Sequence, residues 1–88
     1  MEFKGTKGRW KFEMSNGKPS VIDAEDYCLV DFFGLNEKDT YDALLISKAP
    51  QMLEMLIMIN EGIHTMDFTQ LEILQPEIEQ LIQSATEI

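Results

Sequence analysis

The sequence has few of the residues from which most catalytic and metal sites are built. Its 88 residues include one cysteine, Cys28, and one histidine, His64. A single cysteine cannot form an internal disulfide, and a zinc site usually needs several Cys or His ligands at set spacings. We therefore expect no disulfide framework and no bound metal. Cys28 stands in an apolar run and is interpreted as a small buried hydrophobic side chain, and His64 as an ordinary residue in a loop between helices.

The common motifs of enzyme chemistry are also missing. None of the five glycines belongs to a Gly-x-x-x-x-Gly-Lys phosphate loop, and no serine lies in a nucleophile-elbow context. Asp23, Glu25, Asp26 and Asp31 lack the residue order of a calcium-binding loop, so we assign them to turn formation and solvation. We predict that the protein is not an enzyme, has no catalytic residue and uses no cofactor.

Basic residues are scarce and unevenly distributed. The net charge is −9, with +3 on residues 1–20 and −12 on the rest, and no Lys or Arg follows Lys48. Binding to nucleic acid by phosphate neutralisation needs clustered Lys and Arg, so we expect no direct contact with nucleic acid.

Long apolar segments are absent. The longest, residues 52–59, is far shorter than the roughly 20 residues that span a bilayer. No apolar stretch follows the basic N-terminal residues as in a signal peptide. We expect a cytoplasmic protein that does not enter a membrane.

The first third of the chain has the pattern of a β-meander. Trp10, Phe12 and Met14 alternate with charged residues, as in a strand with one apolar face. Asn16-Gly17 favours a type I′ hairpin turn, and Pro19 suits the start of an edge strand. Residues 21–22 and 27–33 are the next expected strands. We therefore predict a three-stranded antiparallel meander over residues 6–34.

The remainder predicts helices at about 36–49, 50–61 and 70–87. Asn36 is a good N-cap, Pro50 suits the first turn of a helix, and Gly62 is a plausible C-cap. Thr69 and Glu72 match a capping box, and Pro76 predicts a break before a helix over 76–86. The expected fold class is α+β, one domain of residues 1–88 with a helical part at 36–87.

The segment 52–59 is apolar at every position except Glu54. A helix that is apolar all round is buried, and one thin sheet cannot cover it. We expect neighbouring elements or a second copy of the chain to cover it. We predict a protein-interaction module that binds itself, as a dimer or higher oligomer, or another protein. The predicted interface residues are Met52, Met55, Leu56, Met58 and Ile59.

An alternative rests on the acidity of the last forty residues. Carboxylates spaced along a helix can imitate a DNA backbone and occupy a basic cleft. Glu72, Glu77 and Glu79 are the residues we assign to such an acidic face. The alternative function is an acidic, DNA-mimicking inhibitor of a host nuclease or DNA-binding defence protein.

Residues 8–60 also resemble a known group of proteins. The segment 42–56 reads Asp-Ala-Leu-Leu-Ile-Ser-Lys-Ala-Pro-Gln-Met-Leu-Glu-Met-Leu, and Gly8-Arg9-Trp10 opens the first strand. Both features are similar to small phage and prophage proteins of unknown function, although Asp42 and Leu44 depart from the usual Asn and Lys. The resemblance implies a phage or prophage origin, and so a place in the host cytoplasm, but no activity.

Overall fold

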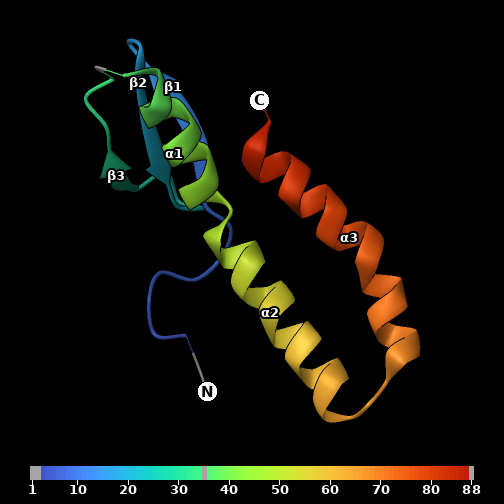
Figure 1. Ribbon diagram of the computed structural model, residues 1–88. Coiled ribbons are helices and arrows are strands. Elements are labelled where there is room, and N and C mark those ends of the chain that lie inside the picture. The colour runs from blue at the N-terminus through green and yellow to red at the C-terminus, as the bar shows by residue number, and fades with distance from the viewer. Residues whose placement is uncertain (1–2, 35, 88) are drawn as a thin grey trace.

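The computed structural model describes residues 3–34 and 36–87, in which three strands are followed by three helices (Figure 1). The strands form one antiparallel sheet in the order β1-β2-β3. The predicted α+β fold with an N-terminal meander is therefore confirmed. The elements are β1 (Lys11–Ser15), β2 (Lys18–Ile22), β3 (Cys28–Asp31), α1 (Glu37–Ser47), α2 (Ala49–His64) and α3 (Phe68–Thr86).

The turn between β1 and β2 is set by its own two residues. Asn16 and Gly17 have φ angles of 54° and 75°. Both angles are positive, as a type I′ turn requires, and Asn and Gly adopt them at little cost. Ser15 pairs with Lys18 across the turn. The predicted hairpin is confirmed, and its turn fixes the register of β1 against β2.

Pro19 departs from expectation. It is buried in β2, the central strand, and not at an edge of the sheet. Proline has no N–H to donate, but Pro19 lies beyond the last residue pair of β2 with β3, Ser20 with Asp31. Its carbonyl oxygen still accepts from the Phe32 N–H at 3.0 Å. The missing donor therefore falls beyond the last residue pair of β2 with β3, although Pro19 still pairs with Met14 of β1.

The strand boundaries also differ from those expected. β1 begins at Lys11, and Trp10 lies before it, with its indole N–H donating to the Thr6 carbonyl at 3.2 Å. β2 is longer than residues 21–22, and β3 is shorter than residues 27–33.

The core under α1 is small. Val21 of β2 and Ala43 of α1 are fully buried, and Ser47 exposes 1% of its surface. The Ser47 hydroxyl donates to the Leu44 carbonyl at 2.6 Å, so this buried polar group is satisfied. The predicted N-cap is confirmed, since Asn36 Oδ1 accepts from the Lys38 N–H at 2.9 Å.

Helices α2 and α3 form an antiparallel hairpin that extends away from the sheet (Figure 1). Pro50 lies in the first turn of α2, where its missing N–H has no cost, as predicted. The predicted C-cap at Gly62 is wrong, because α2 continues to His64. Gly62 is buried against α3, and a Cβ built there would lie 2.8 Å from Leu71 Cδ2. This glycine therefore serves close helix packing, and the left-handed residue is Met66, with φ 59°.

The start of α3 also corrects a prediction. The helix begins at Phe68, and its N-cap is Asp67, whose side chain accepts from the Gln70 N–H at 3.0 Å. Thr69 lies inside the helix, so the capping box of Thr69 and Glu72 is not formed. The tight loop after His64 places the side chain of Asp67, and not that of Thr69, at the N-terminus of α3.

Pro76 does not break α3, which runs continuously through it. A proline inside a helix costs about 3 kcal/mol relative to alanine. Leu74 before it and Ala85 after it are buried at 5% and 4% exposure, whereas Pro76 itself is exposed. Packing of the flanking turns therefore outweighs the local cost, and the helix predicted at 76–86 is the second half of a longer one.

Candidate interaction surface

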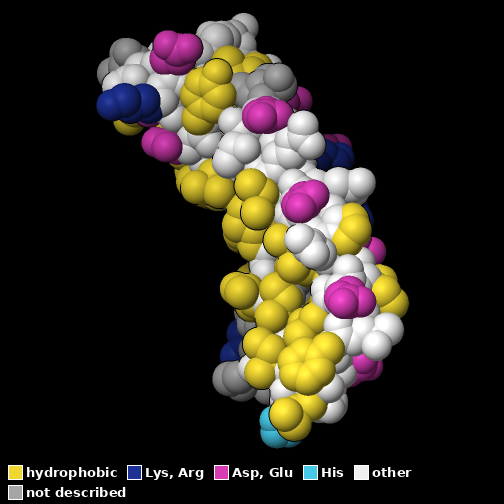
Figure 2. Space-filling view, turned by 45° about the vertical axis from the view of Figure 1, so that its right-hand side comes forward, with side chains coloured by type: hydrophobic (Ala, Val, Ile, Leu, Met, Phe, Trp, Pro, Cys, Tyr) yellow, Lys and Arg dark blue, Asp and Glu magenta, His cyan; other side chains and the backbone are white. Residues whose placement is uncertain are grey.

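One side of the α2–α3 hairpin is apolar along its length (Figure 2). On α2, Met52, Leu56, Ile59 and Ile63 recur at spacings of four, three and four, which places them on one face of the helix. We define the hairpin face as these four residues together with the α3 residues Phe68, Leu71, Ile78 and Ile82.

The hairpin face is open to solvent in the single chain. Leu56 exposes 63% of its surface and Ile63 61%, while Phe68 and Ile82 expose 65% and 58%. Within the chain, neighbouring elements therefore cover the 52–59 segment on one side only. Scattered apolar residues are normal on a protein surface, but a contiguous apolar patch of this kind marks an interaction site.

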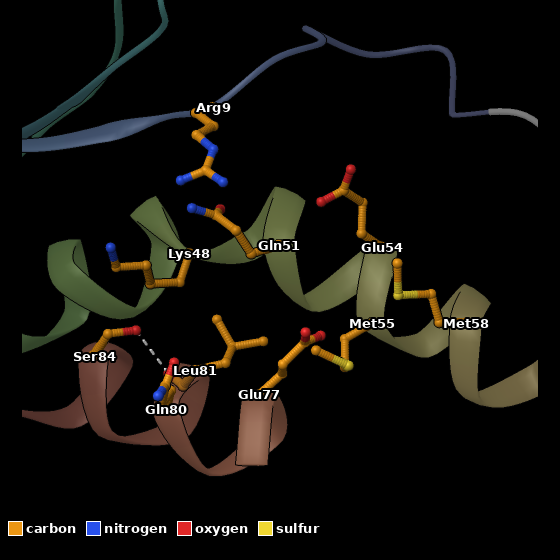
Figure 3. Close-up of a pocket in the computed structure, with 10 residues that line it drawn as sticks. All are labelled: Arg9, Lys48, Gln51, Glu54, Met55, Met58, Glu77, Gln80, Leu81 and Ser84. Atoms are coloured by element: carbon orange, nitrogen blue, oxygen red, sulfur yellow. Dashed lines mark hydrogen bonds between the residues drawn. The ribbon is translucent and has the colours of Figure 1, made fainter. Parts of the chain in front are cut away.

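The five predicted interface residues divide between two sides of α2. Met52, Leu56 and Ile59 lie on the hairpin face. Met55 and Met58 instead line a cavity of about 390 Å³ between α2, α3 and the N-terminal segment (Figure 3). Met52, Met55 and Ile59 are half-buried and Met58 is 41% exposed.

This cavity lies on the back of the hairpin and has a mixed lining. Arg9 and Lys48 bring positive charge, and Glu54 and Glu77 bring negative charge. In Figure 3 the Arg9 guanidinium points toward Gln51. The Ser84 hydroxyl, also in this lining, donates to the Leu81 carbonyl at 2.9 Å. The hairpin face is apolar by contrast, except for Gln75, which shares the helical spacing of Leu71, Ile78 and Ile82 on α3.

The predicted acidic face is not a single face. Glu72 and Glu79 are seven residues apart and share one side of α3, next to the hairpin face. Glu77 lies on the other side and lines the cavity. Two carboxylates about 10 Å apart along the helix do not reproduce the dense charge of a DNA strand, one per 3.4 Å. The arrangement does not favour the DNA-mimic alternative.

The acidic turn after β2 has a structural role. Asp23 Oδ1 accepts from the N–H groups of Glu25 and Tyr27, both at 2.9 Å. This is the turn-forming role expected of such a residue. Among residues 3–34 and 36–87, no three Asp, Glu, His or Cys side chains gather into a group that could hold a metal ion. His64 is an exposed residue at the end of α2, not in the loop as expected.

Cys28 is exposed, so the prediction of a buried side chain is wrong. It is the first residue of β3, an edge strand. Its thiol pKa is raised above the ordinary value, first by partial desolvation and then by the hydrogen bond and negative charge of Asp31. A raised pKa leaves less of the reactive thiolate at neutral pH. The position therefore disfavours a nucleophilic role.

Alkylation of Cys28 tests this environment. At pH 8 we expect iodoacetamide to modify Cys28 more slowly than a cysteine in an unstructured peptide, because only the thiolate reacts and the raised pKa leaves less of it. Asp31→Asn removes the negative charge and should move the midpoint of the rate–pH profile to lower pH. Mass spectrometry of timed reactions gives both rates, and an unchanged midpoint in Asp31→Asn would contradict the assigned cause.

In the part of the chain that the structure describes, no helix is both long enough and apolar enough to cross a membrane. No family model matches the sequence, and no curated protein or solved structure matches it either.

Five residues of the hairpin face are absent from the interface that the sequence predicts: Ile63, Phe68, Leu71, Ile78 and Ile82. Ile63 continues the helical spacing of Leu56 and Ile59, but the C-cap expected at Gly62 excluded it from the helix. Phe68 was placed in a loop because the capping residue was misassigned. Leu71, Ile78 and Ile82 were not assigned to the interface, because the broad apolar side of α3 does not show where its packed part ends.

Proposed function

We propose that this protein is a non-enzymatic interaction module that self-associates through the hairpin face. The observation that carries the proposal is the open apolar band of Leu56, Ile63, Phe68 and Ile82, each more than half exposed. Exposing these side chains to water is unfavourable, and a protein partner removes that cost.

The size of the exposed surface supports this proposal. A folded monomer of 10.1 kDa is expected to expose about 5,300 Å², whereas this chain exposes 6835 Å². Its radius of gyration is 15.1 Å, against about 12 Å for a compact chain of this length. The hairpin and the extended N-terminal segment account for this open shape (Figure 1).

The surplus is larger than the area that a second copy would cover in a standard-size interface. It amounts to about 1,500 Å² per chain, whereas each partner in such an interface contributes about 800 Å². A face that runs along two antiparallel helices is complementary to the same face of another hairpin, as in four-helix bundles. A two-fold dimer uses the same patch on both copies, so one such face is sufficient.

Sedimentation equilibrium tests the proposal. We expect a dimer of about twice the 10.1 kDa chain mass at tens of micromolar protein, with a concentration-dependent return to monomer on dilution. A single monomeric species up to about 200 μM would contradict self-association, because an interface of this size with an apolar centre supports micromolar affinity or better.

We further propose a phage or prophage origin and a location in the host cytoplasm. This rests on the resemblance of residues 8–60 to small phage proteins and on the absence of an apolar run as long as a membrane span in the sequence.

A further inference from the structure

The two long edges of the hairpin face differ in charge. Along the α3 edge, Glu72 and Glu79 flank the apolar residues. Along the α2 edge runs the N-terminal segment, where Lys7 and Arg9 line a groove with Leu53, Glu54 and Ile57 of α2, so that two cationic side chains and one carboxylate lie there. Figure 2 shows acidic side chains on one side of the apolar band and a small basic area beside its other side, in the lower half of the view. The face therefore has an acidic edge along α3 and, along α2, an edge with a net positive charge, which we call the basic edge.

The two edges lie at the same height along the hairpin. Gly62 of α2 contacts Leu71 of α3, and Met55 and Met58 share the cavity with Glu77 and Leu81. Because the helices are antiparallel, Glu79 lies at the level of residues 53–57. This is also the level at which Lys7 and its neighbours cross α2.

Two-fold symmetry allows two face-to-face arrangements of such hairpins. If the axis is perpendicular to the helices, the hairpins point in opposite directions and each edge meets the same edge of the other copy, acid against acid. If the axis is parallel to the helices, the hairpins point in the same direction. The acidic edge of each copy then meets the basic edge of the other, at matching height.

We propose, building on the self-association proposed above, that the two copies pair with their hairpins pointing in the same direction. Each Glu79 edge then faces the Lys7 segment of the other copy, and both sheets lie at one end of a four-helix bundle. Opposite charges across the rim of an interface select this register over the alternative, where like charges are juxtaposed. The contact between opposite charges matters in a chain with net charge −9, because two such copies otherwise repel each other.

Charge reversal at the acidic edge tests the orientation. We expect Glu79→Lys to raise the dimer dissociation constant roughly three- to tenfold at 50 mM salt, because it places Lys against the partner's basic segment. The matched control is Glu61→Lys, which makes the same charge change on the back of α2. Because it only lowers the net negative charge, it should leave the dissociation constant unchanged or reduce it.

Two further measurements complete the test. Lys7→Glu combined with Glu79→Lys should restore most of the affinity for the dimer. At 500 mM salt the dissociation constants of Glu79→Lys and the wild-type chain should become nearly equal, since salt screens charges at the rim of an interface. Circular dichroism establishes that the variants fold. Tighter dimers of Glu79→Lys would overturn the orientation while leaving self-association intact. A monomeric wild-type chain would instead remove self-association itself.

Discussion

Ile63→Glu is expected to convert the dimer to a monomer at concentrations where the wild-type chain is fully associated. Ile63 lies on the hairpin face and exposes 61% of its surface in the single chain. Burying a carboxylate in an apolar interface costs about 2–4 kcal/mol, which raises the dissociation constant roughly 30- to 1,000-fold. In the monomer the same side chain is free to stay in water, so folding itself should change by no more than about 0.5 kcal/mol.

The structure offers a matched control in Ile73→Glu. Ile73 is also an isoleucine in the tip half of the hairpin, and it exposes 65% of its surface. It lies five residues after Phe68, on the other side of α3, and so outside the hairpin face. Sedimentation of the two variants at equal concentration should give a monomer for Ile63→Glu and a dimer for Ile73→Glu. Equal dissociation constants would show that the dimer uses a different surface.

Pro76→Ala is expected to stabilise the protein by about 1–3 kcal/mol. Pro76 lies inside the continuous helix α3, where proline lacks a hydrogen-bond donor and its ring crowds the preceding turn. Its side chain is exposed, so the change to alanine sacrifices little packing. For a chain of this size the gain corresponds to several degrees or more in melting temperature.

The gain in stability is measured by chemical denaturation in the Ile63→Glu background, where the chain is expected to be monomeric. In a dimer, association would add a concentration-dependent contribution to the free energy of unfolding. Gln83→Ala is the control, because Gln83 is another exposed position in α3 and its change should remain within about 0.5 kcal/mol. A loss of stability in Pro76→Ala would mean that the restricted backbone of proline is needed for the shape of α3.

Local chemistry was sufficient for several predictions. Asn16 and Gly17 form the predicted turn because their positive φ angles depend on their own side chains. Asn36 caps α1 through a bond to a residue two positions away. Pro50 begins α2 because its ring favours the first helical turn. Each of these features involves neighbours in sequence, and so could be predicted from the residues alone.

The errors arose where two local signals competed or where distant contacts prevail. Asp67 and Thr69 are both good helix caps, and the tight loop after α2 favours Asp67. Gly62 fits a C-cap equally well in sequence, but Leu71 packs against it from another helix. Pro76 predicts a break, but burial of Leu74 and Ala85 keeps α3 continuous. At Gly62 and Pro76 the deciding contacts come from residues whose proximity the sequence does not reveal, whereas the cap of α3 was a choice between two neighbouring candidates.

The amino-acid pattern was enough to establish an α+β chain, an acidic surface and a helix at residues 52–59 that is too apolar to remain fully hydrated. Which side of that helix is covered depends on the position of α3. It packs along Met55 and Gly62 and leaves Leu56 and Ile63 open. The reason is physical: helical periodicity specifies which residues share a face, whereas burial of a face depends on what packs against it in three dimensions.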